Sequence, residues 1–320
     1  MTREWRPAAD PDVIRARARL TARVRAFFDQ RGVTEVTTPV LSRASIPDPN
    51  IPSMSAQTAQ GRRYLQTSPE FPMKRLLAAG SGDIFQICPV FRDGESGQWH
   101  NPEFELLEWY RLGLDELALA RECASLVECV VERPTQLQET EFLSYRDAFV
   151  RHAGIDPLDA STEEIAETAI EILGTGGPKD WTASEWLDLL GATRVWPALG
   201  RGRVTVVTDF PQDQAALARL RPGNPPTAAR FELFLDGIEL ANGFHELTDA
   251  GEQRARFEAD NRRRRARGLP EVPLDECLLE ALAHGLPDCA GVALGLDRLY
   301  ALALGASSIA EVMSFPSDRA

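Results

Sequence analysis

An aromatic ring and a carboxylate can share one face of a strand predicted in the first half of the chain. Residues 103–110 read EFELLEWY, and in a β-strand alternate residues point the same way. Those on one face here are Phe104, Leu106, Glu108 and Tyr110. The ring of Phe104 and the carboxylate of Glu108 would lie about 13 Å apart. This face could hold an extended ligand with a flat ring at one end and a cation at the other.

Carboxylates that could hold a divalent cation lie near residue 240. Residues 231–247 read FELFLDGIELANGFHEL, which is two β-runs around an Asp-Gly pair that strongly predicts a hairpin. The second run carries Glu239 and Glu246. Plain alternation sends these carboxylates to opposite faces, so a shared site requires a bulge, which we expect at Gly243. Without a shared site, both carboxylates would simply be exposed.

A third segment with polar side chains lies where a short strand meets a helix. Residues 64–70 read YLQTSPE and are followed by a predicted helix through Met73 to Ala79. By themselves, Ser68 and Glu70 can be explained as caps of that helix, because an acidic residue near a helix start is favoured by the helix dipole.

A strand near the C-terminus has a face almost without side chains. Residues 290–305 read AGVALGLDRLYALALG. The first half predicts a strand with Gly291, Ala293 and Gly295 on one face, and the second half predicts an apolar helix from about Asp297. Such a strand lets a ligand lie against the backbone.

The elements that must position these residues follow from periodicity. A helix is expected over Pro11–Arg31, a β-branched strand over Gly32–Leu41, and an apolar strand over Phe85–Phe91 that pairs antiparallel with the strand after Pro102. Arginines of the first helix are expected to form a solvated face. They are Arg15, Arg17, Arg19, Arg23 and Arg25.

Helices dominate the middle of the chain. One is expected over Leu112–Val131, and shorter ones over Ser161–Leu173 and Ser184–Leu190. We therefore expect one domain over 1–320 with a helical insertion at about 134–200. A buried strand follows at Arg203–Phe210. The helix over Asp249–Arg267 ends in five arginines that complement its dipole or, alternatively, dock an acidic partner.

Composition narrows the class of protein. The chain has 320 residues, of which 43% are hydrophobic, enough for a large core. It shows no apolar run of membrane-spanning length and no secretory signal, so a cytoplasmic location without a membrane is expected. Five cysteines without a C-x-x-C pair indicate reduced, mostly buried thiols. The net charge of −13 argues against extensive contact with RNA.

Three segments together resemble the class II aminoacyl-tRNA synthetases. FRDGESGQWHNPEFELLEWY, residues 91–110, resembles motif 2, and GVALGLDR, residues 291–298, resembles motif 3. The first helix and the strand ending at Pro39 resemble motif 1. TSPE and IELANGFHEL make the lysyl-tRNA synthetase group the best match. The resemblance runs from about Ile14 to the C-terminus and implies an α+β catalytic fold, an antiparallel sheet flanked by helices.

The resemblance implies a role for each matching residue. Arg92 and Arg298 would be catalytic, and Glu239 and Glu246 would bind Mg²⁺. The residues implied to bind ATP are Arg92, Asp93, Gly94, His100, Asn101, Phe104, Glu239, Leu240, Gly295 and Arg298. The residues implied to bind the amino acid are Ser68, Pro69, Glu70, Glu108, Tyr110, Glu246 and Ala293. Three carboxylates in one small pocket would have raised pKa values unless a dication entered.

Two positions depart from the pattern of the lysyl group. Gly94 stands where motif 2 has glutamate, so either Glu95 substitutes or a contact to ATP is lost. Ala293 replaces a glycine, as it does in the short paralogues of the group. Its methyl group narrows the amino-acid pocket and would favour β-lysine over α-lysine by about 10- to 200-fold.

Those short paralogues attach (R)-β-lysine to a lysine side chain of translation elongation factor P. About a dozen residues precede the first helix, so no anticodon-binding domain is expected, and tRNA is the less favoured acceptor. The resemblance therefore implies an ATP-dependent ligase, a homodimer, acting on elongation factor P. The alternatives are aminoacylation of RNA, a non-catalytic regulatory homologue, and a ligase with a small-molecule acceptor.

Overall fold

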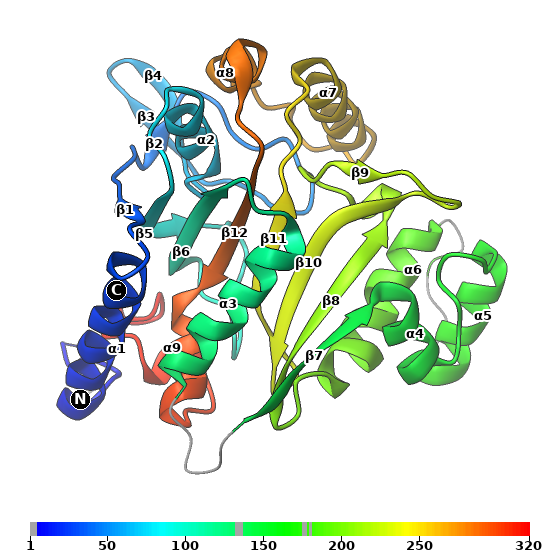
Figure 1. Ribbon diagram of the computed structural model, residues 1–320, viewed down its shortest axis with the longest axis horizontal. Coiled ribbons are helices and arrows are strands. Elements are labelled where there is room, and N and C mark those ends of the chain that lie inside the picture. The colour runs from blue at the N-terminus through cyan, green and yellow to red at the C-terminus, as the bar shows by residue number, and fades with distance from the viewer. Residues whose placement is uncertain (1–4, 132–136, 175–177, 179–180) are drawn as a thin grey trace. The chain divides into compact units, whose positions relative to one another are not determined.

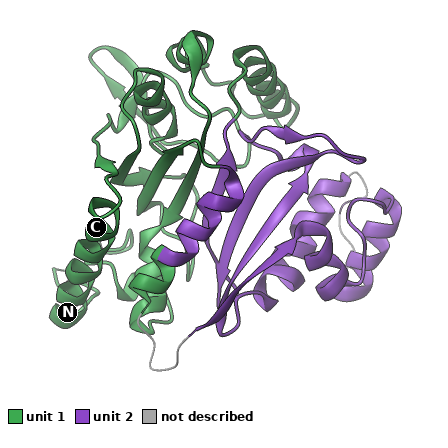
Figure 2. Ribbon diagram, viewed as in Figure 1, with its two compact units in different colours: residues 1–114, 126–132, 247–320 green, residues 115–125, 133–246 purple. Residues whose placement is uncertain are grey.

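The computed structural model of the chain describes residues 5–131, 137–174, 178 and 181–320. The chain forms two compact units (Figure 2). The first contains residues 1–114, 126–132 and 247–320, and the second contains residues 115–125 and 133–246. Their boundary falls inside α3 (Glu116–Val130), so the chain passes between the units within one helix.

The first unit is built on strands from both ends of the sequence (Figure 1). Its strand order is β1-β5-β6-β12, and a separate small sheet has the order β2-β4-β3. The strands are β1 (Thr34–Glu35), β2 (Leu41–Ser42), β3 (Ser55–Thr58), β4 (Gly61–Leu65), β5 (Ile84–Phe91), β6 (Glu103–Leu112) and β12 (Cys289–Gly295). The helices are α1 (Pro11–Asp29), α2 (Glu70–Ala78), α7 (Ala250–Ala266), α8 (Glu276–Gly285), α9 (Leu296–Leu304) and the 3₁₀ turn Ile309–Glu311.

The apolar side of this unit lies between α1 and the strands. Helix α1 is capped by Asp10, whose carboxylate accepts hydrogen bonds from the amides of its first turn. Its buried Phe28 stacks on Phe85 with ring centroids 4.4 Å apart and meets Trp109 edge-on at 5.3 Å. Phe85 and Trp109 are paired across β5 and β6. Because strand side chains alternate, this packing leaves the other face to Phe104 and Glu108.

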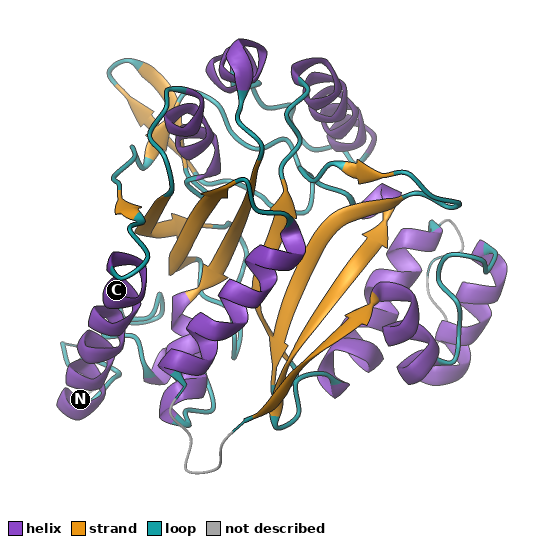
Figure 3. Cartoon of the chain, in the orientation of Figure 1, coloured by secondary structure: helices purple, strands orange, loops and turns teal. Residues whose placement is uncertain are grey.

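The second unit combines strands with short helices on one side of them (Figure 3). Its strand order is β11-β10-β8-β7, with β9 paired to β10. The strands are β7 (Gln138–Ser144), β8 (Arg203–Pro211), β9 (Leu220–Arg221), β10 (Thr227–Leu235) and β11 (Ile238–His245). The helices are α4 (Tyr145–Ala153), α5 (Thr162–Leu173), α6 (Ala183–Leu190), a π-helix (Gly191–Val195) and 3₁₀ turns (Trp196–Ala198 and Gln212–Gln214).

Aromatic rings form much of the second unit's core. Tyr145 stacks on Phe149 at 4.5 Å, and Trp196 stacks on Phe234 at 5.2 Å. Phe210 of β8 contacts Tyr145 at 5.0 Å. These contacts join α4, the 3₁₀ turn and two strands into one hydrophobic cluster. The helices therefore bury their apolar sides against β8 and β10.

The predicted α+β class is confirmed, and most predicted elements lie within a few residues of their expected bounds. The long strand expected over Gly32–Leu41 is wrong. Only β1 and β2 form there, because Pro39 has no amide hydrogen to continue a ladder. The first residues of the proposed insertion, 134–136, lie outside the described residues. The part of that stretch that is described contains β7 as well as three α-helices.

The described helices contain no segment both long and apolar enough to cross a bilayer.

Candidate active site

The face opposite α1 brings three strands into register. Glu108 of β6 is paired with Gln86 of β5 on one side and with Ala293 of β12 on the other. Two residues further along β6, Tyr110 is paired with Gly291. In the opposite direction Leu106 is paired with Gly295, and Phe104 is paired with Val90. The predicted alternation is therefore present, and the glycine face of β12 lies next to it.

An aromatic ring and a guanidinium group lie together at one end of this face. The Arg92 guanidinium carbon is 5.1 Å from the centroid of the Phe104 ring, within the range of a cation–π contact. Arg92 Nη1 is 3.6 Å from Glu95 Oε1. Asp93 and Gly94 are exposed, and Gly94 adopts φ of 76°. Glu95 therefore contacts Arg92, while Gly94 forms the turn.

Arg298 lies in the first turn of α9 and reaches the loop between β5 and β6. Its Nε donates to the carbonyl oxygen of Trp99 at 3.1 Å, and its Nη2 lies 2.7 Å from Nε2 of His100. A Cβ atom at Gly295 would lie 3.8 Å from the Arg298 side chain. Arg92 and Arg298 are thus both held at the Phe104 end of the face, although they are 206 positions apart in the sequence.

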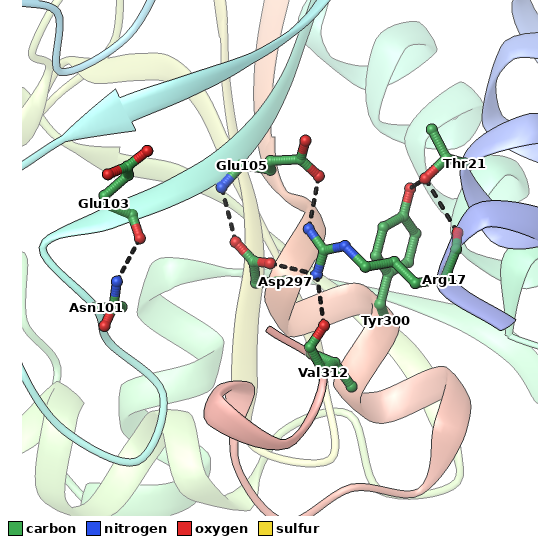
Figure 4. A network of polar contacts seen from close by, with 8 residues as sticks. All are labelled: Arg17, Thr21, Asn101, Glu103, Glu105, Asp297, Tyr300 and Val312. Atoms are coloured by element: carbon green, nitrogen blue, oxygen red, sulfur yellow. Dashed lines mark hydrogen bonds and ion pairs between the residues drawn. The ribbon is translucent and has the colours of Figure 1, made fainter. Parts of the chain in front are cut away.

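Asn101, for which the resemblance implied a role in binding ATP, makes hydrogen bonds to the backbone of Glu103 and Ser317. Its side chain is buried, its Nδ2 donates to the Glu103 carbonyl at 2.6 Å, and its Oδ1 accepts from the Ser317 amide at 3.0 Å. Figure 4 shows the contact to Glu103. Both polar atoms of the Asn101 side chain therefore bind the protein's own backbone and fix the loop to the C-terminal segment.

The other end of the face is acidic and buried. Glu108 is 2% exposed, and its Oε1 accepts a hydrogen bond from the Tyr110 hydroxyl at 2.7 Å. Burial, followed by the negative charge of Glu108, raises the pKa of the nearby Cys88 thiol to about 12. A carboxylate as buried as Glu108 suits a cationic ligand, which would pair with its charge.

The loop before α2 neutralises its own carboxylate. Ser68 Oγ accepts from the Glu70 amide at 3.1 Å, Pro69 is buried at the start of α2, and Glu70 Oε1 lies 2.6 Å from Lys74 Nζ. Lys74 is 2% exposed. The expectation of three mutually repelling carboxylates omitted this lysine. The i,i+4 spacing of Glu70 and Lys74 was the signal that could have found it.

The predicted hairpin of the second unit is present, but its bulge is elsewhere. Asp236 and Gly237 both have positive φ, as a two-residue type I′ turn requires. Leu233 pairs with Ala241 and Phe234 pairs with Glu239, so the extra residue is Leu240, which is buried. The expectation of a bulge at Gly243 is wrong, because Gly243 pairs regularly with Phe231.

The bulge places the predicted carboxylates on one face. Glu232 pairs with Asn242, and Phe234 of the same face pairs with Glu239. Continuing the alternation from Asn242 brings Glu246 to that face as well. Glu246 is 1% exposed and forms a main-chain bridge with Ala218. Two carboxylates on one face fit Mg²⁺, which proteins commonly hold with one or two carboxylates plus substrate phosphates.

A polar cluster that the sequence reasoning missed lies beside Glu239. Arg230 forms a 2.5 Å ion pair with Glu232, donates from Nε to Asn242 Oδ1 at 3.1 Å, and lies over the Phe210 ring at 4.4 Å. Burial, followed by the charge of Glu239, raises the pKa of Glu232 to about 8. The spacing of Arg230 and Glu232, two residues apart on one strand face, was the available signal.

Arg17 ties the first helix to the site (Figure 4). Its guanidinium bonds Glu105 at 2.6 Å, Asp297 at 2.6 Å and the carbonyl oxygen of Val312 at 3.1 Å. Its side chain is 19% exposed. The prediction of a solvated arginine face is therefore wrong at Arg17, because three acceptors from distant segments surround it.

Asp297 completes this junction. Its Oδ2 accepts from the amide of Glu105 at 2.7 Å, at the position where β12 has already turned into α9. The pairing of β12 with β6 ends at Gly295 and Leu106. The Asp297 carboxylate therefore accepts the hydrogen bond from the Glu105 amide that a continued β12 backbone would have accepted. Arg298 follows directly, so the start of α9 is fixed to β6 and α1 immediately beside the predicted catalytic arginine.

The sequence matches a known family over almost the whole chain. The family model described as tRNA synthetases class II (D, K and N) matches residues 4–319. The chain therefore belongs to the class II tRNA synthetase family.

Relatives within the family have a more specific name. A protein of Klebsiella pneumoniae strain 342 named elongation factor P--(R)-beta-lysine ligase is 48% identical over 326 aligned positions, covering 100% of this chain and 99% of the relative. Proteins with the same name from Edwardsiella ictaluri and Salmonella typhi are each 47% identical and cover 99% and 100% of this chain, respectively.

Proposed function

We propose that this protein is an ATP-dependent ligase that activates (R)-β-lysine and transfers it to a lysine side chain of translation elongation factor P. The names of relatives that align with almost the entire chain support this substrate and this acceptor. The observation that supports it most strongly is the strand face with Phe104 and two arginines at one end and the buried Glu108–Tyr110 pair at the other.

The reaction must first activate a carboxylic acid. The carboxylate of β-lysine attacks the α-phosphorus of ATP, pyrophosphate leaves, and the amine of the acceptor lysine then displaces AMP. Negative charge grows on the α-phosphate in the first step, where fixed cationic donors lower the barrier. Arg92 would bind the α-phosphate and the substrate carboxylate, since a planar guanidinium can contact two oxygens.

The nucleotide would lie at the Phe104 end of the face. Phe104 would stack on adenine, and Arg298, held by Trp99 and His100, would contact the triphosphate. Gly295 of β12 has no side chain at this position, and an added Cβ atom would lie 3.8 Å from the Arg298 side chain. In the second unit, Glu239 and Glu246 would hold Mg²⁺, which neutralises phosphate charge when bound.

The amino acid would lie at the acidic end. Glu108, oriented by the Tyr110 hydroxyl, would accept the distal ammonium group. The Ser68–Glu70 loop would contact the other amine, with Lys74 held against Glu70 by an ion pair. Ala293, opposite Glu108, adds a methyl group to the glycine face and would favour the β-amino acid over the α-amino acid.

The proposed assembly is a cytoplasmic homodimer that acts on a protein and makes no extensive contact with RNA. The chain's net charge of −13 supports the second point, because phosphate binding requires basic side chains. The resemblance of α1 and β1 to motif 1 supports the dimer.

Intact-protein mass spectrometry tests the proposed function directly. The purified protein, ATP, Mg²⁺, labelled (R)-β-lysine and elongation factor P are incubated, and the factor is expected to gain the mass of one β-lysyl residue. Labelled α-lysine should give a much slower gain. An Arg92→Ala variant should abolish the gain, because it removes the proposed α-phosphate ligand.

Parallel reactions with bulk tRNA identify the main alternative. Labelled tRNA together with an unmodified factor would show that RNA is the acceptor. Absence of pyrophosphate exchange with every diamino acid would instead indicate a non-catalytic homologue, and the proposal would be abandoned in both cases.

A further inference from the structure

A buried glutamine beside Glu108 is not assigned any role by the motifs. Gln86 of β5 is paired directly with Glu108 of β6, so both side chains point to the same face. Directly paired residues on antiparallel strands have Cβ atoms about 5 Å apart. Gln86 is 3% exposed and Glu108 is 2% exposed. The two polar side chains are thus buried neighbours at the acidic end of the candidate site.

One acceptor of this glutamine is unused. Within the described part of the chain, the buried Oε1 atom of Gln86 has no hydrogen-bond partner. A buried acceptor without a donor destabilises a folded protein by about 1–3 kcal/mol. Proteins tolerate such an atom where a ligand supplies the missing donor. The position of Gln86 therefore points to a ligand that brings N–H or O–H groups next to Glu108.

The environment of Gln86 indicates what kind of donor is expected. Its strand neighbours on this face are Cys88, whose thiol accepts from Gln66 Nε2 at 3.4 Å, and Ile84, which is buried. On the other side of Glu108, the paired residue of β12 is Ala293, whose side chain is a methyl group. Across the three strands, the side chains are therefore the neutral amide of Gln86, the carboxylate of Glu108 and the methyl group of Ala293. A ligand group with one positive charge and several hydrogen-bond donors suits these side chains, and a negatively charged ligand group does not.

We infer that Gln86 is a specificity-determining residue that accepts a hydrogen bond from the distal ammonium group of the diamino acid, beside Glu108. The inference rests on the proposed function. An ammonium group has three donors and no acceptor. Glu108 neutralises its charge and accepts one donor, and Gln86 Oε1 accepts a second. Two of the three ammonium donors thereby have acceptors on residues that are at most 3% exposed.

An amide suits this position better than a second carboxylate. Two adjacent buried carboxylates disfavour each other's ionisation, so one of them would take up a proton. Gln86 adds an acceptor without adding charge, and it leaves Glu108 as the single counter-ion. The pair selects for a cationic group and against an uncharged chain of the same length, because the uncharged chain supplies neither a donor for Gln86 Oε1 nor a positive charge for Glu108.

Replacing the amide by a thioether of similar size tests the inference. Gln86→Met is compared with the wild type by pyrophosphate exchange, using (R)-β-lysine and (R)-3-aminohexanoic acid, which lacks only the distal amine. We expect kcat/KM for β-lysine to fall by about 10- to 100-fold, the loss typical of a hydrogen bond to a charged group. Exchange with 3-aminohexanoic acid and the KM for ATP should stay within about twofold, since the lost hydrogen bond involves neither of these substrates.

The stability of the ligand-free variant separates a binding role from a structural one. Because Gln86→Met removes an unsatisfied buried acceptor, we expect its thermal midpoint to equal or exceed that of the wild type. Gln57→Met, at an exposed glutamine on β3, is the matched control and should change neither activity nor midpoint. Gln86→Asn keeps the amide but shortens it by one methylene, and it should lose affinity for β-lysine as well.

The possible outcomes differ clearly. A folded Gln86→Met protein that exchanges with β-lysine as fast as the wild type would overturn the inference, and would indicate that a water molecule satisfies Oε1. A loss that is equal for β-lysine and 3-aminohexanoic acid would also overturn it. If the wild type does not exchange with β-lysine at all, the proposed function fails first, and the role of Gln86 fails with it.

Discussion

Glu232 shows what a single carboxyl group experiences when it is buried beside another. It is 8% exposed, its ion pair with Arg230 is 2.5 Å long, and its pKa is nevertheless raised to about 8 by burial and by the charge of Glu239. The protonated form is thus favoured in the folded protein. One arginine does not compensate for the removal of this carboxylate from water.

The raised pKa of Glu232 predicts a dependence of stability on pH. Between about pH 4.5 and pH 8 the folded state holds a proton that the unfolded state has lost, so stability falls as the pH rises through this range. The slope is at most about 1.4 kcal/mol per pH unit. The side chain of the Glu232→Gln variant cannot titrate. The thermal midpoint of this variant, measured relative to that of the wild type, should therefore rise from pH 5 to pH 8.

Glu167→Gln, at an exposed position on α5, serves as the control and should track the wild type at every pH. If the difference between Glu232→Gln and the wild type stayed constant across the range, the carboxyl group would have an ordinary pKa.

At the scale of elements, the bulge at Leu240 and the junction at Arg17 both align functional side chains. The bulge inserts one residue into β11, so Glu239 joins the face of Asn242. The junction holds α1, β6 and α9 through one guanidinium group (Figure 4). The bulge thus orients Glu239, the proposed Mg²⁺ ligand, and the ion pair fixes the start of α9 next to Arg298, the proposed catalytic residue.

Arg17→Met is predicted to weaken both the fold and ATP binding. The substitution leaves Asp297, which is 2% exposed, without its cationic partner, and loss of one partner of a buried pair typically costs about 3–5 kcal/mol. Asp297 immediately precedes Arg298, so the KM for ATP should rise as well. Thermal unfolding and pyrophosphate exchange measure the two effects.

Arg15→Met is the matched control on the same helix. Arg15 pairs with Asp12 at the surface, and its side chain is 62% exposed, so its loss should cost less than about 1 kcal/mol. Equal destabilisation of both variants would show that the Arg17 contacts add nothing beyond the helix itself.

At the scale of the whole molecule, the resemblance to motif 1 predicts a dimer formed by the first unit. Large apolar side chains are exposed in and near that segment, and they include Trp5, Ile14 and Leu41. Sedimentation equilibrium should give twice the 35.3 kDa mass of one chain. Leu41→Asp should shift the protein toward the monomer, because the interface would then bury a charge.

Ile170→Asp, at a similarly exposed apolar residue on α5, should leave the mass unchanged. A wild-type protein that sediments as a monomer at micromolar concentration would contradict the proposed dimer.

The sequence by itself determined those features that depend on near neighbours. Alternation put Phe104 and Glu108 on one face, the Asp236-Gly237 pair specified the hairpin, and Asp249 capped α7 as expected. Each of these features depends on backbone geometry over a few residues. The types and the spacing of neighbouring residues are enough to predict that geometry.

The tertiary structure alone decided which distant groups meet. Arg17 and Asp297 are 280 positions apart, and no local pattern predicts their ion pair. The bulge fell at Leu240 rather than Gly243 because the register of β10 with β11 sets it, and the glycine's flexibility does not. Gln86 became a neighbour of Glu108 only when β5 paired with β6. Strand pairing and burial fix these contacts, because a buried charge or amide must find its partner wherever the fold places one.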